Sequence, residues 1–235
     1  MSKYPQRLVG GAALMLAVAT AATSQAADPI QLNRGDRIVF LGDSITQGGD
    51  RPGGYVSIIR STLGEKHSES GIEVIGAGIS GNKVPDLQRR VDKDVIARKP
   101  TIVVIYIGIN DVWHGETDPA RGTSPEKYQA GLKEVIGKCQ AAGARVLLCT
   151  PSVIGEKPAG ANSLDAKLDQ YSDLSRQVAK ELNVPVCDLR QAFLDYLQTH
   201  NPDQQEKGIL TGDRVHLNAA GNKFVAETIL RSLGA

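Results

Sequence analysis

Residues 101–107 read TIVVIYI, an almost unbroken run of apolar and mostly β-branched side chains. A strand with one face in water alternates apolar and polar residues, whereas a strand of a parallel sheet is covered on both faces and is apolar throughout. This stretch therefore predicts a central strand of a parallel sheet. Parallel neighbours must be joined by crossover connections, which are usually helices.

Four further apolar runs are short enough to be strands of the same sheet. They are residues 37–41 (RIVFL), 72–75 (IEVI), 144–149 (ARVLLC) and 184–187 (VPVC). Between them, apolar residues recur every three or four positions over 132–139 and 164–182, which is the spacing of an amphipathic helix. A last helix is predicted to start with Asn218 as its N-cap.

Strands that alternate with helices predict βαβ units and an α/β fold with helices on both faces of a parallel sheet. The expected architecture is a single doubly wound, flavodoxin-like domain with five strands. The length of 235 residues suits one such domain. A net charge of +1 provides no basic surplus for displacing counterions, so nucleic acid is not an expected partner.

The N-terminal segment has the pattern of a secretory signal. Lys3 and Arg7 precede an apolar stretch over 8–23, and small residues follow at Ser24 and Ala26. The stretch is shorter than the about 20 residues of a typical membrane-spanning helix, so stable membrane insertion is not expected. We therefore expect a signal peptide at 1–26, one folded domain at 27–235 and a secreted or periplasmic location. An uncleaved membrane anchor is the alternative.

The three cysteines are Cys139, Cys149 and Cys187. An odd number in an exported protein leaves at least one thiol free or paired between chains. We expect all three to be small core residues, because free cysteine behaves as a buried hydrophobe. No Cys/His cluster indicates a metal, and no metal or cofactor is expected. The sequence does not determine the oligomeric state.

Two strands are followed by polar residues suited to acyl transfer. Ser44 lies in GDSITQG after the first strand, where a serine at a helix start can present its hydroxyl at the rim of the sheet. Asn110 lies in GIND after the third strand, where its amide can donate to a developing oxyanion. The alternatives are a helix N-cap for Ser44 and a simple Asn-Asp turn for Asn110.

Asp213 and His216 precede the last predicted helix in the sequence DRVH. An aspartate three residues before a histidine can fold back and accept the Nδ1–H bond, which leaves Nε2 free to take a proton from serine. The alternative is a solvated aspartate beside a surface histidine.

Residues 76–81 read GAGISG and match the dinucleotide-binding pattern G-x-G-x-x-G. That pattern normally opens the first βαβ unit and has an acidic residue at the end of the next strand. Here it opens the second unit, and Asp92 and Asp94 come before the third strand begins. Close backbone approach is therefore the preferred explanation of these glycines, with the Gly81 N–H directed into the site.

The segments GDSITQG, GAGISG, GIND and DRVH together resemble the four sequence blocks of the GDSL/SGNH hydrolase family, in the family's order. The resemblance implies Ser44 as nucleophile, His216 as general base and Asp213 as its partner. It also implies oxyanion donors from the backbone of Ser44 and Gly81 and from the Asn110 side chain. Many members carry Asn where this chain has Gly76.

These features predict an exported serine esterase that forms an acyl-enzyme on Ser44 and releases short acyl groups such as acetate from a small molecule or carbohydrate. Asp43, Trp113 and His114 are the candidate substrate-binding residues. The alternatives are a lysophospholipase or thioesterase of the same family, a catalytically silent carbohydrate-binding domain and, from GAGISG, a nucleotide-binding protein.

Overall fold

A computed structural model describes Met1 and residues 30–66 and 69–235 of the chain, so nearly all of the predicted signal peptide lies outside the described residues. The helices and strands follow one another in the order β1 (Arg37–Gly42), α1 (Ser44–Gly49), α2 (Tyr55–Lys66), β2 (Glu73–Gly78), α3 (Val84–Asp94), η1 (Ile96–Arg98), β3 (Ile102–Tyr106), α4 (Ile109–Trp113), η2 (Pro119–Arg121), α5 (Pro125–Ala141), β4 (Arg145–Cys149), α6 (Asp165–Glu181), β5 (Val186–Cys187), α7 (Leu189–His200) and α8 (Ala219–Ser232).

Within the described residues, five parallel strands form one sheet in the order β2-β1-β3-β4-β5. This is the predicted flavodoxin-like order, and each predicted run overlaps one strand. In the register, Phe40 of β1 lies opposite Gly76 of β2 and Val104 of β3. β5 is shorter than predicted, because Pro185 has no N–H to donate to a neighbouring strand.

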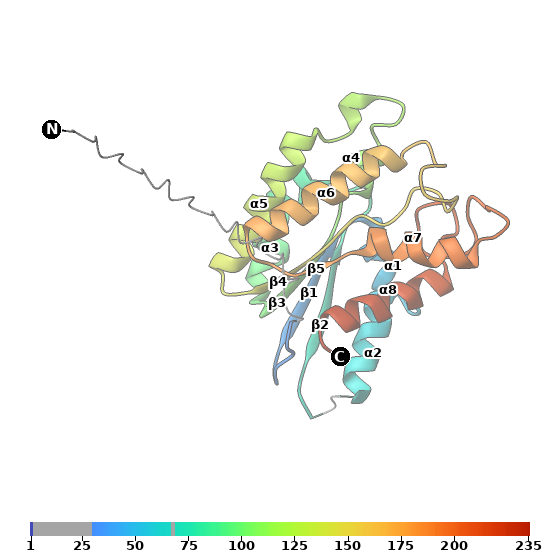
Figure 1. The fold of residues 1–235 in the computed structure, drawn as a ribbon. Helices are drawn as coiled ribbons and strands as arrows, with labels where there is room; N and C mark the ends of the chain where they lie inside the picture. The colour runs from blue at the N-terminus through green and yellow to red at the C-terminus, as the bar shows by residue number, and fades with distance from the viewer. Residues whose placement is uncertain (2–29, 67–68) are drawn as a thin grey trace.

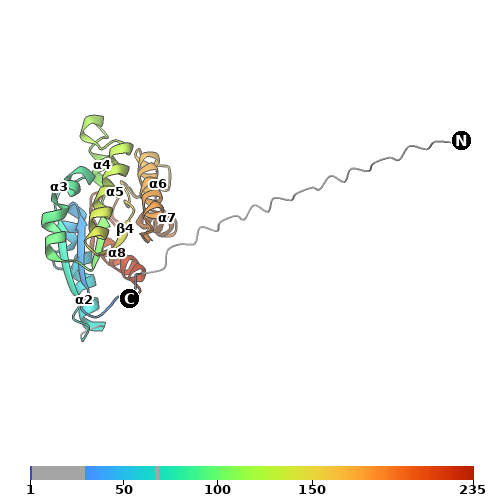
Figure 2. The same cartoon turned by 90° about the vertical axis from the view of Figure 1, so that its left-hand side faces the viewer.

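The sheet has helices on both faces, which explains why β3 is apolar throughout and fully buried. On one face α3 contacts α5 and α5 contacts α6, while on the other α2 contacts α8. Figure 1 shows these two groups on either side of the strands, and α5 and α6 lie side by side in Figure 2 as well.

Helix starts follow the predicted capping chemistry. The Asn218 side chain accepts a hydrogen bond from the Gly221 N–H at 2.9 Å, which confirms the predicted N-cap of α8. α5 starts with Ser124 as its cap and Pro125 at its first position, where the missing N–H would have had no partner.

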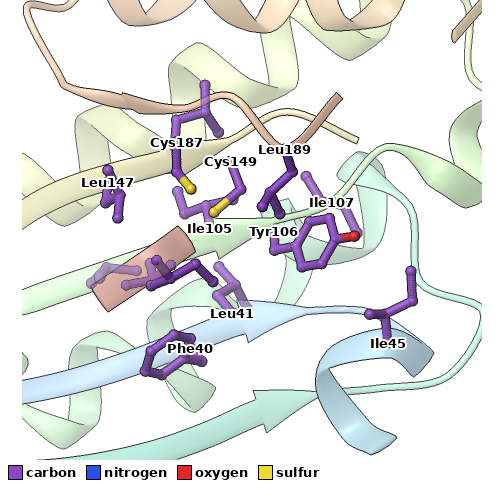
Figure 3. Packing of buried hydrophobic residues seen from close by; sticks show 14 of the residues in the cluster. Phe40, Leu41, Ile45, Ile105, Tyr106, Ile107, Leu147, Cys149, Cys187 and Leu189 are labelled. Carbon is purple, nitrogen blue, oxygen red and sulfur yellow. The ribbon is translucent and has the colours of Figure 1, made fainter. Parts of the chain in front are cut away.

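The predicted burial of the three cysteines is confirmed, since all three are buried and free. Cys149 of β4 and Cys187 of β5 lie opposite each other in the strand register. Figure 3 shows both sulfur atoms within the apolar layer that also holds Leu147 and Ile105.

The strand order reverses between β1 and β3, which is where a ligand site is expected. From β1 the chain continues to β2 on one side, while β3 lies on the other side of β1. In such sheets a crevice opens at the carboxyl ends of the strands where the order reverses, because the connections run away from it in opposite directions. α1, with Ser44, follows β1, and α4, with Asn110, follows β3.

Candidate active site

Ser44 is the first residue of α1, directly beyond β1. The turn closes tightly because Gly42 has no side chain: a Cβ there would lie 2.1 Å from the Thr46 Oγ1 and 2.5 Å from the Tyr106 carbonyl oxygen. The N-cap is Asp43, whose carboxylate accepts the Ile45 N–H at 2.9 Å. The alternative that Ser44 is itself the cap is therefore wrong, and its hydroxyl is available for another partner.

The partner of Ser44 is His216. Ser44 Oγ and His216 Nε2 are 2.8 Å apart, and His216 Nδ1 lies 2.7 Å from Asp213 Oδ2. Asp213 and His216 are therefore linked to each other and to Ser44, although both side chains are also partly exposed to solvent. A histidine held by a carboxylate on one nitrogen can accept a proton from the serine on the other.

The turn from Asp213 to His216 orients this pair. Asp213 Oδ1 accepts the backbone N–H groups of Val215 at 3.1 Å and His216 at 2.7 Å. Partial burial alone would raise the pKa of Asp213, but the bonds from the His216 ring and from these N–H groups hold it below its ordinary value. Arg214 has φ = 88°, a left-handed conformation that is unusual for a residue with a side chain.

Glu156 anchors the segment that leads into this turn, and no motif in the sequence points to it. Its side chain is fully buried, with Oε1 accepting the Leu210 and Thr211 N–H groups at 2.7 and 2.5 Å. Its other oxygen accepts the Ile209 N–H at 2.8 Å. These bonds are made to backbone groups more than 50 residues away, so no local spacing in the sequence predicts them.

The predicted oxyanion donors lie in three different segments. Asn110 is buried in the first turn of α4, so the alternative of a simple Asn-Asp turn is wrong. Its Nδ2 donates to the Asn82 carbonyl oxygen at 3.0 Å. Gly81 has φ = +77°, and its N–H has no partner among the described residues. The Ser44 N–H lacks a helical acceptor because Ser44 starts α1.

Arg90 ties these segments together and was also not identified from the sequence. Its guanidinium donates to the carbonyl oxygens of Gly42 at 2.7 Å and Ala77 at 2.9 Å, at the carboxyl ends of β1 and β2. Its Nε donates to the Asn82 side chain at 2.6 Å. Arg90 therefore positions the same Asn82 whose backbone receives the Asn110 amide.

Asp43 is buried, with 2% of its surface exposed, and its carboxylate acts as a helix cap. This burial leaves it little surface for a substrate to contact. Removal from water raises the pKa of Asp43 to about 7, and the nearby Asp111 carboxylate adds to the rise. Asp111 is buried as well, and burial raises its pKa to about 6 even though it accepts the Val84 N–H.

Trp113 and His114 lie at the end of α4 instead of in an ordinary surface loop. The Trp113 ring meets the His216 ring edge to face, with centroids 6.3 Å apart. His114 lies beyond it, with its ring 6.4 Å from the Trp113 ring. Burial, helped by Lys83 and Arg121, lowers the pKa of His114.

The glycines of residues 76–81 are explained by packing. A Cβ at Gly78 would lie 2.2 Å from the Gln47 backbone nitrogen, and one at Gly76 would meet the Asp50 carboxylate at 2.4 Å. Both residues lie inside β2, and not in a turn that could wrap a pyrophosphate. These contacts favour the predicted close backbone approach over dinucleotide binding.

A cavity of about 620 Å³ opens beside the serine and histidine side chains, and both Ser44 and His216 line it. Neither Trp113 nor His114 is among its lining residues. In residues 30–66 and 69–235, no three His, Cys, Asp or Glu side chains are grouped so as to hold a metal ion. No helix in that part of the chain has the length and apolar character needed to cross a membrane.

Known proteins are similar to this chain in sequence. Residues 40–224 match the GDSL-like lipase/acylhydrolase family. An acetylxylan esterase of Geobacillus stearothermophilus is 34% identical over 219 residues, which cover 87% of this chain and 97% of that protein. An isoamyl acetate-hydrolyzing esterase 1 homolog of Mus musculus is 26% identical over 80% of this chain and 78% of its own.

Solved structures of esterases have the same fold as this chain. The crystal structure of the acetyl xylan esterase AlAXEase superimposes with a TM-score of 0.81 and 43% identity, covering 84% of this chain and 99% of that one. The Geobacillus acetylxylan esterase, Axe2, superimposes with a TM-score of 0.78, 33% identity and coverage of 88% and 97%. Catalytic mutants of Axe2 with a serine, an aspartate or a histidine replaced by alanine have also been solved.

The chain belongs to the GDSL-like lipase/acylhydrolase family. Within that family it is a carboxylic ester hydrolase, as its esterase relatives and their folds indicate.

Proposed function

We propose that this protein is an exported esterase that removes acetyl groups from carbohydrates through an acyl-enzyme on Ser44. The observation that carries the proposal is the 2.8 Å contact between Ser44 Oγ and His216 Nε2, with Asp213 on the other nitrogen of the ring. The substrate class is supported by the relatives, since the two solved structures described above are acetylxylan esterases.

In the proposed reaction, His216 Nε2 takes the Ser44 proton as Oγ attacks the ester carbonyl carbon. The carbonyl oxygen becomes an oxyanion, which accepts hydrogen bonds from the Ser44 and Gly81 N–H groups and from Asn110 Nδ2. His216 then gives the proton to the departing alcohol oxygen, and the C–O bond of the ester breaks. Water adds to the acyl-enzyme by the same route, which releases the acid and restores Ser44.

The test of the nucleophile is covalent labelling. A fluorophosphonate should modify wild-type protein at Ser44 and leave Ser44→Ala unmodified, as read by mass spectrometry of the tryptic peptide. Ser44→Ala should also show no burst of product with an aryl acetate. An unlabelled wild-type Ser44 would contradict the mechanism and favour a silent binding domain, whereas a burst from Ser44→Ala would show that another residue is the nucleophile.

The substrate test is an ester panel on the protein that begins at residue 27. Acetylated xylooligosaccharides and aryl acetate should be hydrolysed faster than butyrate and much faster than octanoate esters. Higher turnover of octanoyl esters, lysophospholipids or acyl thioesters would contradict the carbohydrate assignment and favour the lipase or thioesterase alternative.

Export is the remaining part of the proposal and rests on the pattern of residues 1–26. Removal of Lys3 and Arg7 with this segment changes the net charge from +1 to −1. N-terminal sequencing of protein recovered outside the cytoplasm should begin close to Ala27. Recovery of the full-length chain only in the membrane fraction would favour an uncleaved anchor.

A further inference from the structure

The cavity beside Ser44 and His216 is larger than an acetyl group requires. Its volume is about 620 Å³, and its walls come from the segment that begins at Ser44, from Ser80 and from the segment that begins at His216. In the proposed reaction His216 protonates the departing alcohol, so the cavity lies where the alcohol part of the ester binds. A sugar would therefore occupy it.

Arg51 is the one permanently charged side chain among the described residues that line this cavity. Its guanidinium has no hydrogen bond or ion pair with any described residue. In contrast, the guanidinium of Arg60 contacts Asp50, and Arg90 is held by Asp94 and three further groups. The five N–H donors of Arg51 are therefore available to a ligand.

The backbone holds Arg51 in a defined place relative to the nucleophile. Its N–H donates to the Gly48 carbonyl oxygen at 3.1 Å, and its own carbonyl oxygen accepts the Gly54 N–H at 2.9 Å. This turn directly follows α1, whose first residue is Ser44. Arg51 is the second residue beyond the end of α1 at Gly49, and it lines the same cavity as Ser44.

No carboxylate of the described residues neutralises the guanidinium. Asp50, its neighbour in the chain, is turned toward β2, where it bonds to Arg60 at 2.5 Å and lies against Gly76. Asp213 is engaged with His216, and Asp43 is buried under α1. The alcohol side of the site therefore carries a positive charge that faces the ligand.

We propose that Arg51 binds a carboxylate of the substrate, so that the preferred ester is an acetylated oligosaccharide with an acidic sugar next to the acetylated one. This inference rests on the proposed function. A guanidinium matches a carboxylate with two parallel hydrogen bonds, whereas sugar hydroxyls offer it single, uncharged acceptors. Arg51 would thus set specificity for the leaving alcohol without taking part in the chemistry.

The test compares two acetylated xylooligosaccharides that differ at one group. One carries a uronic acid branch, and in the other the carboxylate is reduced to a primary alcohol. The readout is the ratio of kcat/KM for the acidic and the neutral ester within each variant, so that differences in active-enzyme concentration cancel. Aryl acetate turnover is recorded for the wild type as a separate measure of esterase activity.

Wild type should prefer the acidic ester by about 5- to 20-fold, which is the range for a charge-assisted hydrogen bond at a partly exposed site. Arg51→Gln should bring the ratio close to 1, and Arg51→Lys should retain part of the preference because it keeps the charge but not the paired donors. The preference should also shrink as ionic strength rises from about 0.05 M to about 0.5 M.

The matched control is Arg34→Gln, which should keep the wild-type ratio. Arg34 is also exposed and without a described partner, but it precedes the amino end of β1, at the opposite edge of the sheet. A wild-type ratio near 1, or a preference that survives in Arg51→Gln, would overturn the role of Arg51 alone. Failure to hydrolyse either oligosaccharide would instead overturn the proposed substrate class, and the inference with it.

Discussion

The Asn110 amide is already oriented before any substrate binds. It donates to the Asn82 carbonyl oxygen at 3.0 Å, and Arg90 in turn holds the Asn82 side chain. A donor fixed in this way does not have to be reorganised when charge develops on the carbonyl oxygen of an ester.

We therefore expect Asn110→Ala to lower kcat for an aryl acetate by about 10²–10³, with a much smaller change in KM, because the lost bond forms mainly in the transition state. Steady-state kinetics measures both constants, and fluorophosphonate labelling of Ser44 controls for an intact nucleophile. A kcat within threefold of wild type would show that Asn110 is not an oxyanion donor.

Residues were predictable where a short motif carries the chemistry. DRVH places an aspartate and a histidine within one turn, and their 2.7 Å contact was expected from that spacing. Asp43 was different. It was a candidate for contact with substrate, but its side chain is buried and caps α1 by accepting the Ile45 N–H. Arg51, which is exposed and has neither an apolar pattern nor a motif around it, gave no signal at all.

At the level of elements, the Glu156 side chain joins the loop after β4 to the loop before Asp213. Glu156 follows β4, and its carboxylate receives three backbone N–H groups of the segment before Asp213. Replacing a buried acceptor leaves such donors unpaired, which costs more than the bond itself contributes.

Glu156→Gln should therefore destabilise the protein by about 2–3 kcal/mol and lower Tm by about 5–10 °C, because the amide nitrogen of Gln cannot accept hydrogen bonds. We also expect kcat to fall, since the loop that places His216 loses its anchor. Thermal unfolding followed by circular dichroism and aryl acetate kinetics are the measurements.

Glu206→Gln is the control in the same loop. Glu206 forms an exposed pair with Arg214 at 3.3 Å, so its loss should change the free energy of unfolding by less than about 0.5 kcal/mol. Equal effects of the two substitutions would contradict the anchoring role of Glu156.

The elements themselves were largely predictable. The five apolar runs identified the strands, and the alternation of strands and helices indicated the doubly wound order that the sheet has. The loops were not predictable, because their structure depends on bonds between distant segments. Gly155, for example, donates to the Arg214 carbonyl oxygen.

For the molecule as a whole, two buried carboxyl groups affect the dependence of stability on pH. Burial raises the pKa of Asp43 to about 7 and that of Asp111 to about 6, from 3.8 when unperturbed. At pH values between 3.8 and these raised pKa values, the folded protein holds protons that the unfolded chain has released. Stability from these groups is therefore present at low pH and is lost as pH rises through the folded pKa values.

We expect Tm to fall as pH rises from about 5 to about 8, and Asp43→Asn to reduce this slope, because Asn keeps the acceptor for the Ile45 N–H without a proton to lose. Differential scanning calorimetry across this range measures the slope. Asp203→Asn, at an exposed carboxylate without a described partner, should leave it unchanged. An Asp43→Asn slope equal to that of wild type would show that Asp43 is ionised throughout.

The contact between Ser44 and His216 joins residues 172 positions apart, and β2, β3, β4 and β5 all lie between them in the chain. A protein of this design cannot attack an ester while it is being made, because its hydroxyl leaves the ribosome long before the imidazole that activates it. The enzyme is therefore inert until the whole chain has been made and has folded. In a refolding experiment, esterase activity would return only when the segments that hold Ser44 and His216 have come into contact.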